Sequence, residues 1–131
     1  MGIFKNLMGD KETKTQKTSN VNWINLEDLG QLTEIQETSF AKPVIIFKHS
    51  TTCSISRMAL KNFEMEFSLN DKIDAYYIDL LNFRPISNEI AYKFNVVHQS
   101  PQLLLIKDDK SIYNVSHENI DATALEAEIN L

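Results

Sequence analysis

The feature that most constrains the fold is a continuous apolar run, Val44–Phe47, which is followed by a short polar loop and then by an amphipathic pattern. A strand with no polar position has both of its faces covered, as strands in the centre of a parallel sheet do. After the loop, Ile55, Ala59, Phe63 and Phe67 recur at every fourth position, which predicts a helix. The chain therefore contains a buried strand that leads directly into a helix, as in α/β proteins.

Apolar spacing in the first two thirds of the chain continues this alternation. A short extended piece is expected within residues 21–26, and a helix over residues 26–39, where apolar side chains recur at every third position. Another strand is expected over residues 73–80. It is followed by a helix around residues 86–95, for which Ser87 is the expected N-cap.

The last third of the chain has a different pattern. Two runs of strand-forming residues, 103–106 and 111–115, flank four charged residues, which predicts a hairpin. Asp121 is expected to cap a final helix. The order β-α-β-α-β-α-β-β-α predicts a single α/β domain with a mixed central sheet and helices on both faces.

Length and composition agree with one domain. The chain has 131 residues, of which 43% are hydrophobic and 24% charged, as in soluble globular proteins. Residues 9–20 contain no large apolar side chain, so their burial cannot offset the entropy lost on ordering them. We therefore expect a flexible polar lead-in over residues 1–20 and a folded domain over residues 21–131.

The charge and the absence of long apolar runs restrict the possible functions. Thirteen Lys and Arg against 18 Asp and Glu give a net charge of −5, which argues against binding to a phosphate backbone. No run approaches the ~20 apolar residues of a membrane span, and the first residues lack the apolar core of a signal peptide. We expect a cytoplasmic protein, either a monomer or a weak dimer, with small molecules or proteins as partners and neither nucleic acid nor membrane.

The single cysteine, Cys53, lies in the polar loop where the second predicted helix begins. One thiol excludes both an intramolecular disulfide and a multi-thiolate metal site within the chain. A helix N-terminus favours an anion, which for a cysteine is the nucleophilic thiolate. Ser56 and Thr52 are the neighbours expected to stabilise that thiolate. The alternative is a small buried core cysteine, but Cys53 is flanked by polar residues rather than by an apolar run.

Other polar residues lie near this loop in the sequence. Lys48, His49 and Arg57 add positive or proton-accepting groups, although the sequence does not direct any of them at the thiol. The three histidines and the cysteine do not have the spacing of a metal site, so no metal role is expected.

A second candidate segment, Val97–Gln102 (VHQSPQ), comes directly before the predicted hairpin. Pro101 is either an ordinary strand-entry residue or a cis-proline that tertiary packing holds. His98 either lines the thiol pocket or binds the backbone carbonyls of its own loop. Arg84, between a strand and a helix, either faces the site and binds an anionic group or is simply exposed.

Three separated segments together resemble the monothiol bacilliredoxins of bacteria that use bacillithiol: KHSTTCSIS around Cys53, RPISN from Arg84, and HQSPQ from His98. The resemblance covers roughly residues 22–120 and implies a thioredoxin-like fold in which Pro101 is the cis-proline beside the thiol. One departure is Ser54, because members of that family often carry proline directly after the cysteine, where it pre-sets the helical φ.

The resemblance also implies a reaction, in which Cys53 removes bacillithiol from mixed disulfides on cytoplasmic proteins. Bacillithiol is then the co-substrate and bacillithiolated proteins are the partners, with no tightly bound cofactor. Ser100, Pro101, His98 and Arg84 are the substrate-binding residues of this interpretation. Two other functions stay open, namely an iron–sulfur or low-molecular-weight-thiol carrier and a thioredoxin-like binding module with an inert thiol.

Overall fold

The computed structural model describes residues 19–130. Its five strands are β2 (Trp23–Asn25), β3 (Val44–His49), β4 (Asp74–Asp79), β5 (Gln102–Lys107) and β6 (Lys110–Ser116). They form one sheet in the order β2-β4-β3-β5-β6. The central strand, β3, pairs in parallel with β4 and antiparallel with β5, so the sheet is mixed, as predicted.

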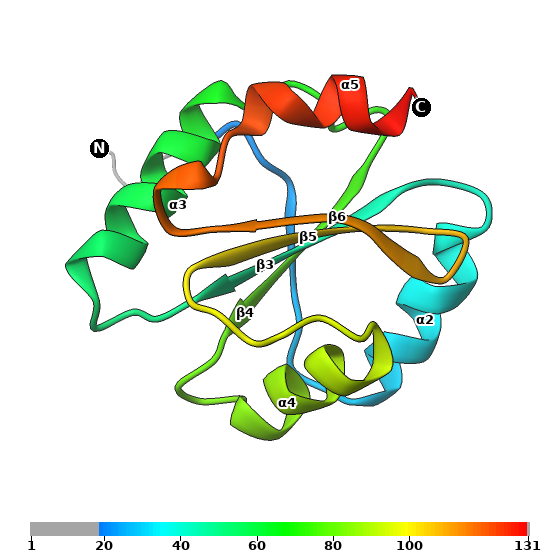
Figure 1. Cartoon of the computed structure of the whole chain (residues 1–131), viewed down its shortest axis with the longest axis horizontal. Coiled ribbons are helices and arrows are strands. Elements are labelled where there is room, and N and C mark those ends of the chain that lie inside the picture. Colours follow the sequence, from blue (N-terminus) through cyan, green and yellow to red (C-terminus); the bar gives the residue numbers. More distant parts are fainter. Residues whose placement is uncertain (1–18, 131) are drawn as a thin grey trace, which may run out of the picture.

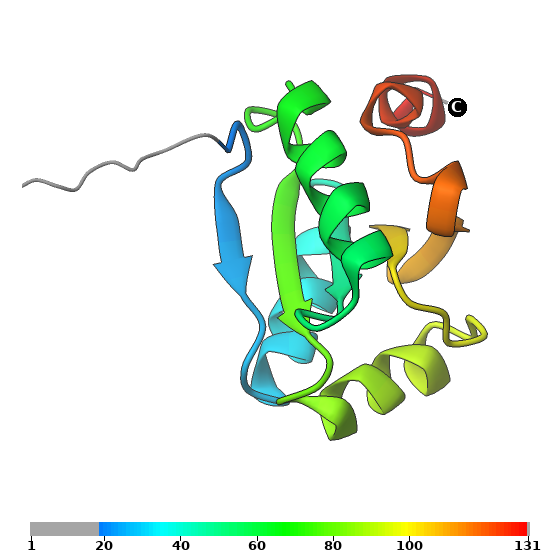
Figure 2. The same ribbon diagram turned by 90° about the vertical axis from the view of Figure 1, so that its left-hand side faces the viewer.

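Helices cover both faces of this sheet. They are α2 (Gly30–Ser39), α3 (Ser54–Glu66), α4 (Arg84–Lys93) and α5 (Leu125–Ile129), with the 3-10 turns η2 (His117–Asn119) and η3 (Ala122–Ala124) before α5. In Figure 1, α3 and α5 lie on one side of the sheet and α2 and α4 on the other. Figure 2, turned by 90°, shows the same separation. The predicted order of elements is confirmed.

The strand that the apolar run predicts is the centre of the hydrophobic core. All six residues of β3 are buried. Because side chains alternate along a strand, Val44 and Ile46 join the core beneath α2 and α4, whereas Ile45 and Phe47 join the core beneath α3 and α5. The two residues that complete β3, Lys48 and His49, are polar and equally buried, and they carry this alternation into the functional end of the strand.

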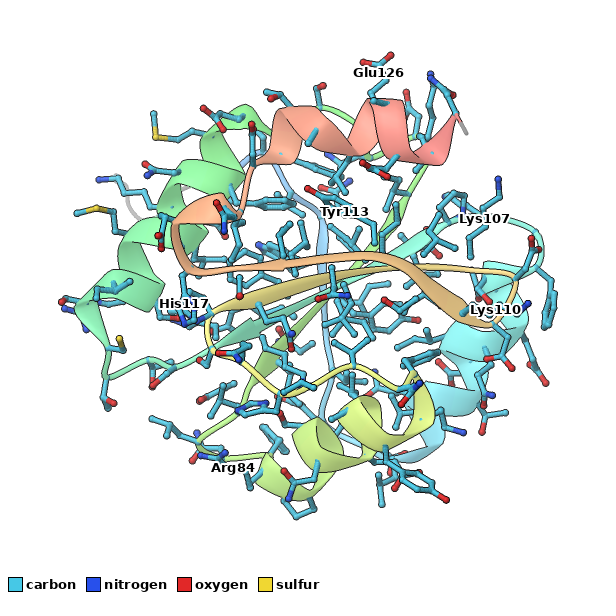
Figure 3. All side chains as sticks on the ribbon, in the orientation of Figure 1. Arg84, Lys107, Lys110, Tyr113, His117 and Glu126 are labelled. Carbon is cyan, nitrogen blue, oxygen red and sulfur yellow. The ribbon has the colours of Figure 1, made fainter. Side chains whose placement is uncertain are left out.

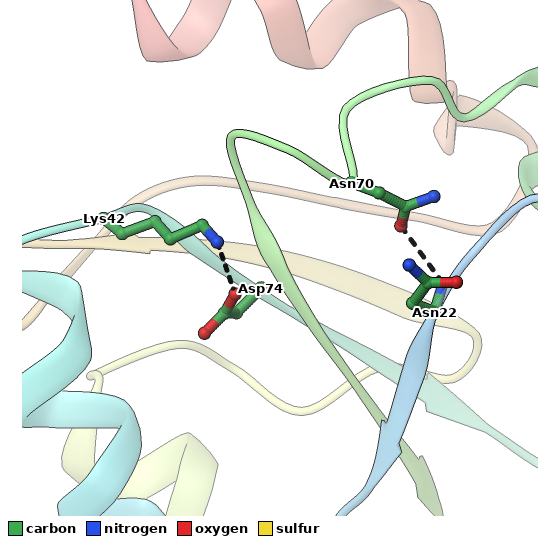
Figure 4. Close-up of polar contacts among 4 residues, drawn as sticks. All are labelled: Asn22, Lys42, Asn70 and Asp74. Carbon is green, nitrogen blue, oxygen red and sulfur yellow. Dashed lines mark hydrogen bonds and ion pairs between the residues drawn. The ribbon is translucent and has the colours of Figure 1, made fainter.

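Polar contacts fix the starting ends of the strands (Figure 4). The ammonium of Lys42, before β3, lies 2.9 Å from a carboxylate oxygen of Asp74, the first residue of β4. The backbone N–H of Asn22, before β2, donates to Oδ1 of Asn70 at 3.1 Å. β2, β3 and β4 are parallel, so their carboxyl ends meet at the opposite edge, which is where α/β proteins place ligands.

The described residues begin within the lead-in that the sequence predicts. Asn20, which the sequence assigned to the flexible lead-in, donates from its backbone to Glu64 O at 3.2 Å and from its side chain to Met65 O at 2.9 Å. These bonds tie it to the end of α3, because its amide groups find carbonyl acceptors there despite the polar composition. The rest of the predicted lead-in, residues 1–18, and residue 131 lie outside the described residues.

The predicted start of the first helix is wrong. The expected helix over residues 26–39 begins only at Gly30, and Leu29 is 53% exposed. Leu26 is buried in the extended approach to the helix, where its N–H donates to Tyr77 O at 2.8 Å. A buried residue before the helix thus continued the apolar spacing by coincidence, which made the predicted helix too long.

Ser87 is not an N-cap. It is fully buried inside α4, which begins at Arg84 after the N-cap residue Phe83. The better signal was Pro85, because proline is favoured in the first turn of a helix.

The C-terminal part agrees with the sequence. Asp108 and Asp109 connect β5 and β6 with φ values of 52° and 63°, the left-handed backbone of a two-residue hairpin turn. Asp121 caps η3, which leads into α5, by accepting the N–H of Thr123 at 3.0 Å. Among the helices described over residues 19–130, none is long and apolar enough to cross a membrane.

Candidate functional site

Cys53 is the N-cap residue of α3 and is half-buried, in the position that the sequence predicts. Its carbonyl accepts the N–H of Arg57 at 3.0 Å, the first bond of the helix, and its own N–H donates to Ser50 O at 3.2 Å. Its side chain makes no capping hydrogen bond. As the N-cap residue, Cys53 lies at the end of α3 where the first-turn N–H groups have no partner within the helix and the helix dipole is positive.

The Ser56 hydroxyl is directed into the loop. It accepts a hydrogen bond from the Ser50 N–H at 3.0 Å and shares another with Nδ1 of His49 at 2.7 Å. The Ser56 hydroxyl therefore bonds to His49 and Ser50, and not to the Cys53 sulfur as the sequence predicted. Ser56 and His49 are only 0% and 3% exposed, so this contact is an internal anchor that fastens the thiol loop to β3.

The surroundings of His49 favour the neutral form of its imidazole. Its ring lies 5.7 Å from the Tyr77 ring, centroid to centroid. Burial lowers the pKa of His49 below its ordinary value, although the charge of Asp79 acts in the opposite direction. A neutral imidazole next to a hydroxyl suits a structural hydrogen bond better than an ion pair.

Thr52 and Arg57 lie on the outer rim of the loop. Thr52 is exposed, and its hydroxyl lies 3.5 Å from the Ser50 hydroxyl. The Arg57 guanidinium donates to Thr51 O at 3.2 Å, from the first turn of α3 back to the loop. These contacts bracket the loop on its solvent side, whereas the Ser56 anchor holds it from within.

The Ser100–Pro101 segment supplies the second loop of the site. Its peptide bond is cis, and Pro101 is buried with its carbonyl accepting the His117 N–H at 3.1 Å. The Ser100 hydroxyl oxygen is buried and has no hydrogen-bond partner within the described chain. Buried polar atoms of this kind are rare, and each needs a reason, such as a role in binding.

A cluster of polar side chains joins this loop to β3 and α4. Lys48 is fully buried, and its ammonium donates to Ser87 O at 3.2 Å and to Nδ1 of His98 at 3.2 Å. The Ser87 hydroxyl also lies 3.5 Å from that nitrogen. Gln102, likewise buried, donates to Val97 O at 3.0 Å and so closes the loop at its base.

The electrostatics of this cluster are positive. Burial, followed by the charge of Arg84, lowers the pKa of Lys48 to about 8. The pKa of His98 is also lowered, by burial and by the charges of Lys48 and Arg84. Arg84 is therefore close enough to influence both groups, although it is itself exposed at the start of α4. Lys48 remains an ammonium at neutral pH, next to a neutral His98.

Figure 3 places Arg84 and His117 at one end of the sheet, whereas Lys107 and Lys110 mark the hairpin at the other end. His117 also borders a cavity of about 470 Å³ that runs along the exposed face of α3. Apolar side chains dominate this cavity, and Ile55 and Met58 within it are 64% and 66% exposed. The apolar groove therefore begins at Ser54, next to Cys53, whereas the cationic cluster contains Lys48, the residue before the His49 that anchors the thiol loop.

Apart from Arg84, at the start of α4, the predicted residues lie in or next to two loops that are anchored on the same strand. From the sequence, Lys48 and His49 had no predicted role. Ser87 was predicted only as an N-cap, and Gln102 was predicted only as the end of a candidate segment, whereas both are buried and bonded within the cluster. The signal that could have found the first two is their position, because they directly continue a buried strand. Within residues 19–130, no group of three His, Cys, Asp or Glu side chains is placed to hold a metal ion.

Comparison with known proteins agrees with this geometry. A family model described as "Monothiol bacilliredoxin BrxC" matches residues 24–125 of the chain. A solved structure described as a thioredoxin-fold protein of suggested oxidoreductase activity shares 32% sequence identity, with a TM-score of 0.71, over 82% of this chain and 93% of that chain.

More distant structures are similar in fold alone. A thioredoxin from Nicotiana alata is 18% identical with a TM-score of 0.64, over 88% of this chain and 96% of that chain. A thioredoxin from Malassezia sympodialis is 20% identical with a TM-score of 0.63, over 89% of this chain and 96% of that chain. The predicted thioredoxin-like fold is confirmed.

Proposed function

Because the chain belongs to the monothiol bacilliredoxin family and has a thioredoxin fold, its chemistry is thiol–disulfide exchange, and we propose that Cys53 removes bacillithiol from mixed disulfides on proteins. The observation that carries the proposal is the position of Cys53, the single thiol of the chain, half-buried at the N-terminus of α3. The reaction takes place in the cytoplasm, where bacillithiolated proteins are the partners and bacillithiol is the co-substrate.

The first step transfers the bacillithiol group. The Cys53 thiolate attacks the bacillithiol sulfur of the mixed disulfide, and a new S–S bond forms as the client S–S bond breaks. The client leaves as a thiolate and takes up a proton from solvent. The products are a repaired client and Cys53 bonded to bacillithiol, so no electrons are gained or lost overall.

The second step needs another thiol. The chain has no second cysteine, and the position three residues after Cys53 carries Ser56, whose hydroxyl is no nucleophile towards a disulfide. A free bacillithiol thiolate therefore attacks the adduct, which releases Cys53 and forms bacillithiol disulfide. Another redoxin with a free thiol discharges the adduct in the same way.

The other predicted residues bind the substrate in this proposal. Arg84 and His98 contact an acidic group of bacillithiol, which the positive charge of Arg84 and the nearby Lys48 favours. Ser100 and Pro101 present backbone groups to an extended client segment, as in strand addition. The unpartnered Ser100 hydroxyl supports this assignment, because a bound ligand would supply the missing hydrogen bond.

The test is a stalled reaction. The protein, mixed with a bacillithiolated client and no other thiol, is expected to stop after one turnover with a single bacillithiol on Cys53, as measured by intact mass. Added bacillithiol then restarts turnover, and Cys53→Ala never begins. A client that stays modified, together with an unmodified Cys53, would contradict the proposal and favour a binding module with an inert thiol.

A carrier function gives a different outcome in the same preparation. Protein purified without oxygen would then show the visible absorption of an iron–sulfur cluster, and exchange with the client would be absent. The carrier would hold the cluster in a dimer, with Cys53 of each copy and a bound small thiol as ligands. We expect no such absorption, because the proposed exchange needs no metal.

A further inference from the structure

Lys48 is a buried cation for which the reaction above has no direct use. It is 0% exposed, and its two hydrogen-bond acceptors, Ser87 O and Nδ1 of His98, are both neutral. The charge that perturbs its pKa is the like charge of Arg84. A buried ammonium without a carboxylate costs stability, so its presence at this place calls for another reason.

The geometry of the contact determines how His98 is protonated. An ammonium can only donate, so Nδ1 of His98 must accept the bond from Lys48. A neutral imidazole whose Nδ1 accepts carries its proton on Nε2. That nitrogen therefore becomes a donor on the side of the ring away from Lys48, and the adjacent ammonium polarises its N–H bond.

We propose that Lys48 is a positioning residue, which holds His98 with its Nε2–H group presented to the acidic part of the bound low-molecular-weight thiol. Arg84 supplies the second, exposed donor of the same subsite. Lys48 touches no substrate atom, because it is fully buried, and it acts through His98. Its effect on substrate rests on the proposed function, whereas the tautomer of His98 does not.

The bond also fixes the loop. Lys48 belongs to the central strand, Ser87 to α4 and His98 to the segment that leads to Ser100 and Pro101. One ammonium therefore joins the three parts that surround the proposed subsite. A purely structural tie would be equally served by a neutral donor and would not discriminate between substrates by charge.

The first measurement uses the unmodified protein. Nitrogen chemical shifts of His98 are expected to show a proton on Nε2 and an unprotonated Nδ1 at neutral pH. A proton on Nδ1, or rapid averaging of the two tautomers, overturns the proposal. This result depends neither on the activity of Cys53 nor on the folding of any variant.

The second measurement compares Lys48→Met, which removes the donor and the charge, with Lys48→Gln, which keeps N–H donors on a shorter side chain. Substrates are one client protein carrying either bacillithiol or uncharged 2-mercaptoethanol. For Lys48→Met we expect averaged His98 tautomers and a KM for the bacillithiol adduct raised about tenfold, the usual order for one hydrogen bond to a charged group. The KM for the uncharged adduct should rise less, because this adduct lacks the acidic group that His98 binds, although both adducts lose the tie from Lys48 to the Ser100–Pro101 loop.

Lys48→Gln should keep the Nε2–H tautomer and recover part of the loss in KM. Lys42→Met is the matched control, because it removes one positive charge at the other end of β3, where Lys42 pairs with Asp74. Lys42→Met should leave the KM for both adducts unchanged. An equal effect of Lys48→Met on both adducts, or an unchanged His98 tautomer, overturns the proposal. A wild-type protein inactive on both adducts contradicts the proposed function instead.

Discussion

Two adjacent residues of the central strand, Lys48 and His49, bury polar side chains on opposite faces of the sheet. His49 bonds to Ser56 on the α3 side, and Lys48 bonds to His98 on the α4 side. Each bond fastens one loop of the site, yet one is neutral and the other carries an ammonium. From this difference we infer that the bond of His49 contributes stability to the thiol loop, whereas the bond of Lys48 contributes charge to the Ser100–Pro101 loop.

The largest effect is expected from breaking the neutral anchor. Ser56→Ala removes the hydroxyl that binds both Nδ1 of His49 and the Ser50 N–H. These two polar groups then lack this partner inside the protein. We expect the free energy of unfolding to fall by about 2 kcal/mol, measured by urea denaturation. Ser54→Ala, at an exposed position two residues earlier, is the control and should have little effect. Equal midpoints for the two variants would show that the anchor is unimportant.

The charged anchor, which is the bond from Lys48 to His98, should affect the free energy of unfolding in alkaline solution. Burial lowers the pKa of Lys48 to about 8 from an unfolded value near 10.5, so between these values the unfolded chain binds more protons. The free energy of unfolding of the wild type should therefore rise with pH across this window relative to Lys48→Met, by on the order of 1 kcal/mol.

Measuring the difference between these two proteins removes the contribution of the tyrosines. Burial raises the pKa values of Tyr76 and Tyr77 in both proteins, and their ionisation destabilises both alike. A difference that stays flat from pH 8 to 10.5 would mean that Lys48 is not a desolvated ammonium.

A smaller effect is expected on the acid side. Burial is the main cause that lowers the pKa values of His49 and His98, so the unfolded chain binds protons first as the pH falls. Both histidines therefore contribute stability that is present above pH ~6.5 and is lost as the pH falls below it. His49→Gln should reduce this loss in urea titrations between pH 7 and 5. A variant that loses stability as steeply as the wild type would assign the loss to other groups.

The smallest effect concerns the first residue of α3. Ser54→Pro should raise the free energy of unfolding by about 0.5 kcal/mol, because proline fixes a helical φ and a first-turn N–H has no helical partner to lose. The chemical denaturation midpoint measures it, with Ser68→Pro, beyond the end of α3, as a comparison outside the helix. A lower midpoint for Ser54→Pro would mean that the Ser54 N–H has a partner that matters.

The fold could be predicted well from the sequence, because its strongest patterns span only a few neighbouring residues and still determine which surfaces pack against distant parts of the chain. The apolar run of β3 and the spacing from Ile55 to Phe67 each determine an element and the face that it buries. The start of α2 was predicted poorly, because burial of Leu26 depends on its hydrogen bond to β4 and not on its neighbours in sequence.

The candidate site was predicted in outline, and its internal bonds were not. Cys53 and Pro101 are marked by local chemistry, a lone thiol in a polar loop and a proline at a strand entry. The partners of Ser56 are instead decided by the backbone path of residues 50–53, which brings His49 back to the first turn of α3. Lys48 and His98 are fifty residues apart in sequence, and no pattern in one chain links them.

The occupied hydroxyl of Ser56 also limits how this protein could be redesigned or could diverge into a dithiol enzyme. A cysteine at position 56 would replace the group that both His49 and the Ser50 N–H use, so a resolving thiol and the present loop anchor compete for one site. Introducing it would require a second change, at His49, towards a side chain that needs no hydroxyl partner. We therefore expect Ser56→Cys alone to lower the free energy of unfolding, because a thiol is a weaker hydrogen-bonding group than a hydroxyl, and we expect the added change at His49 to recover part of this loss.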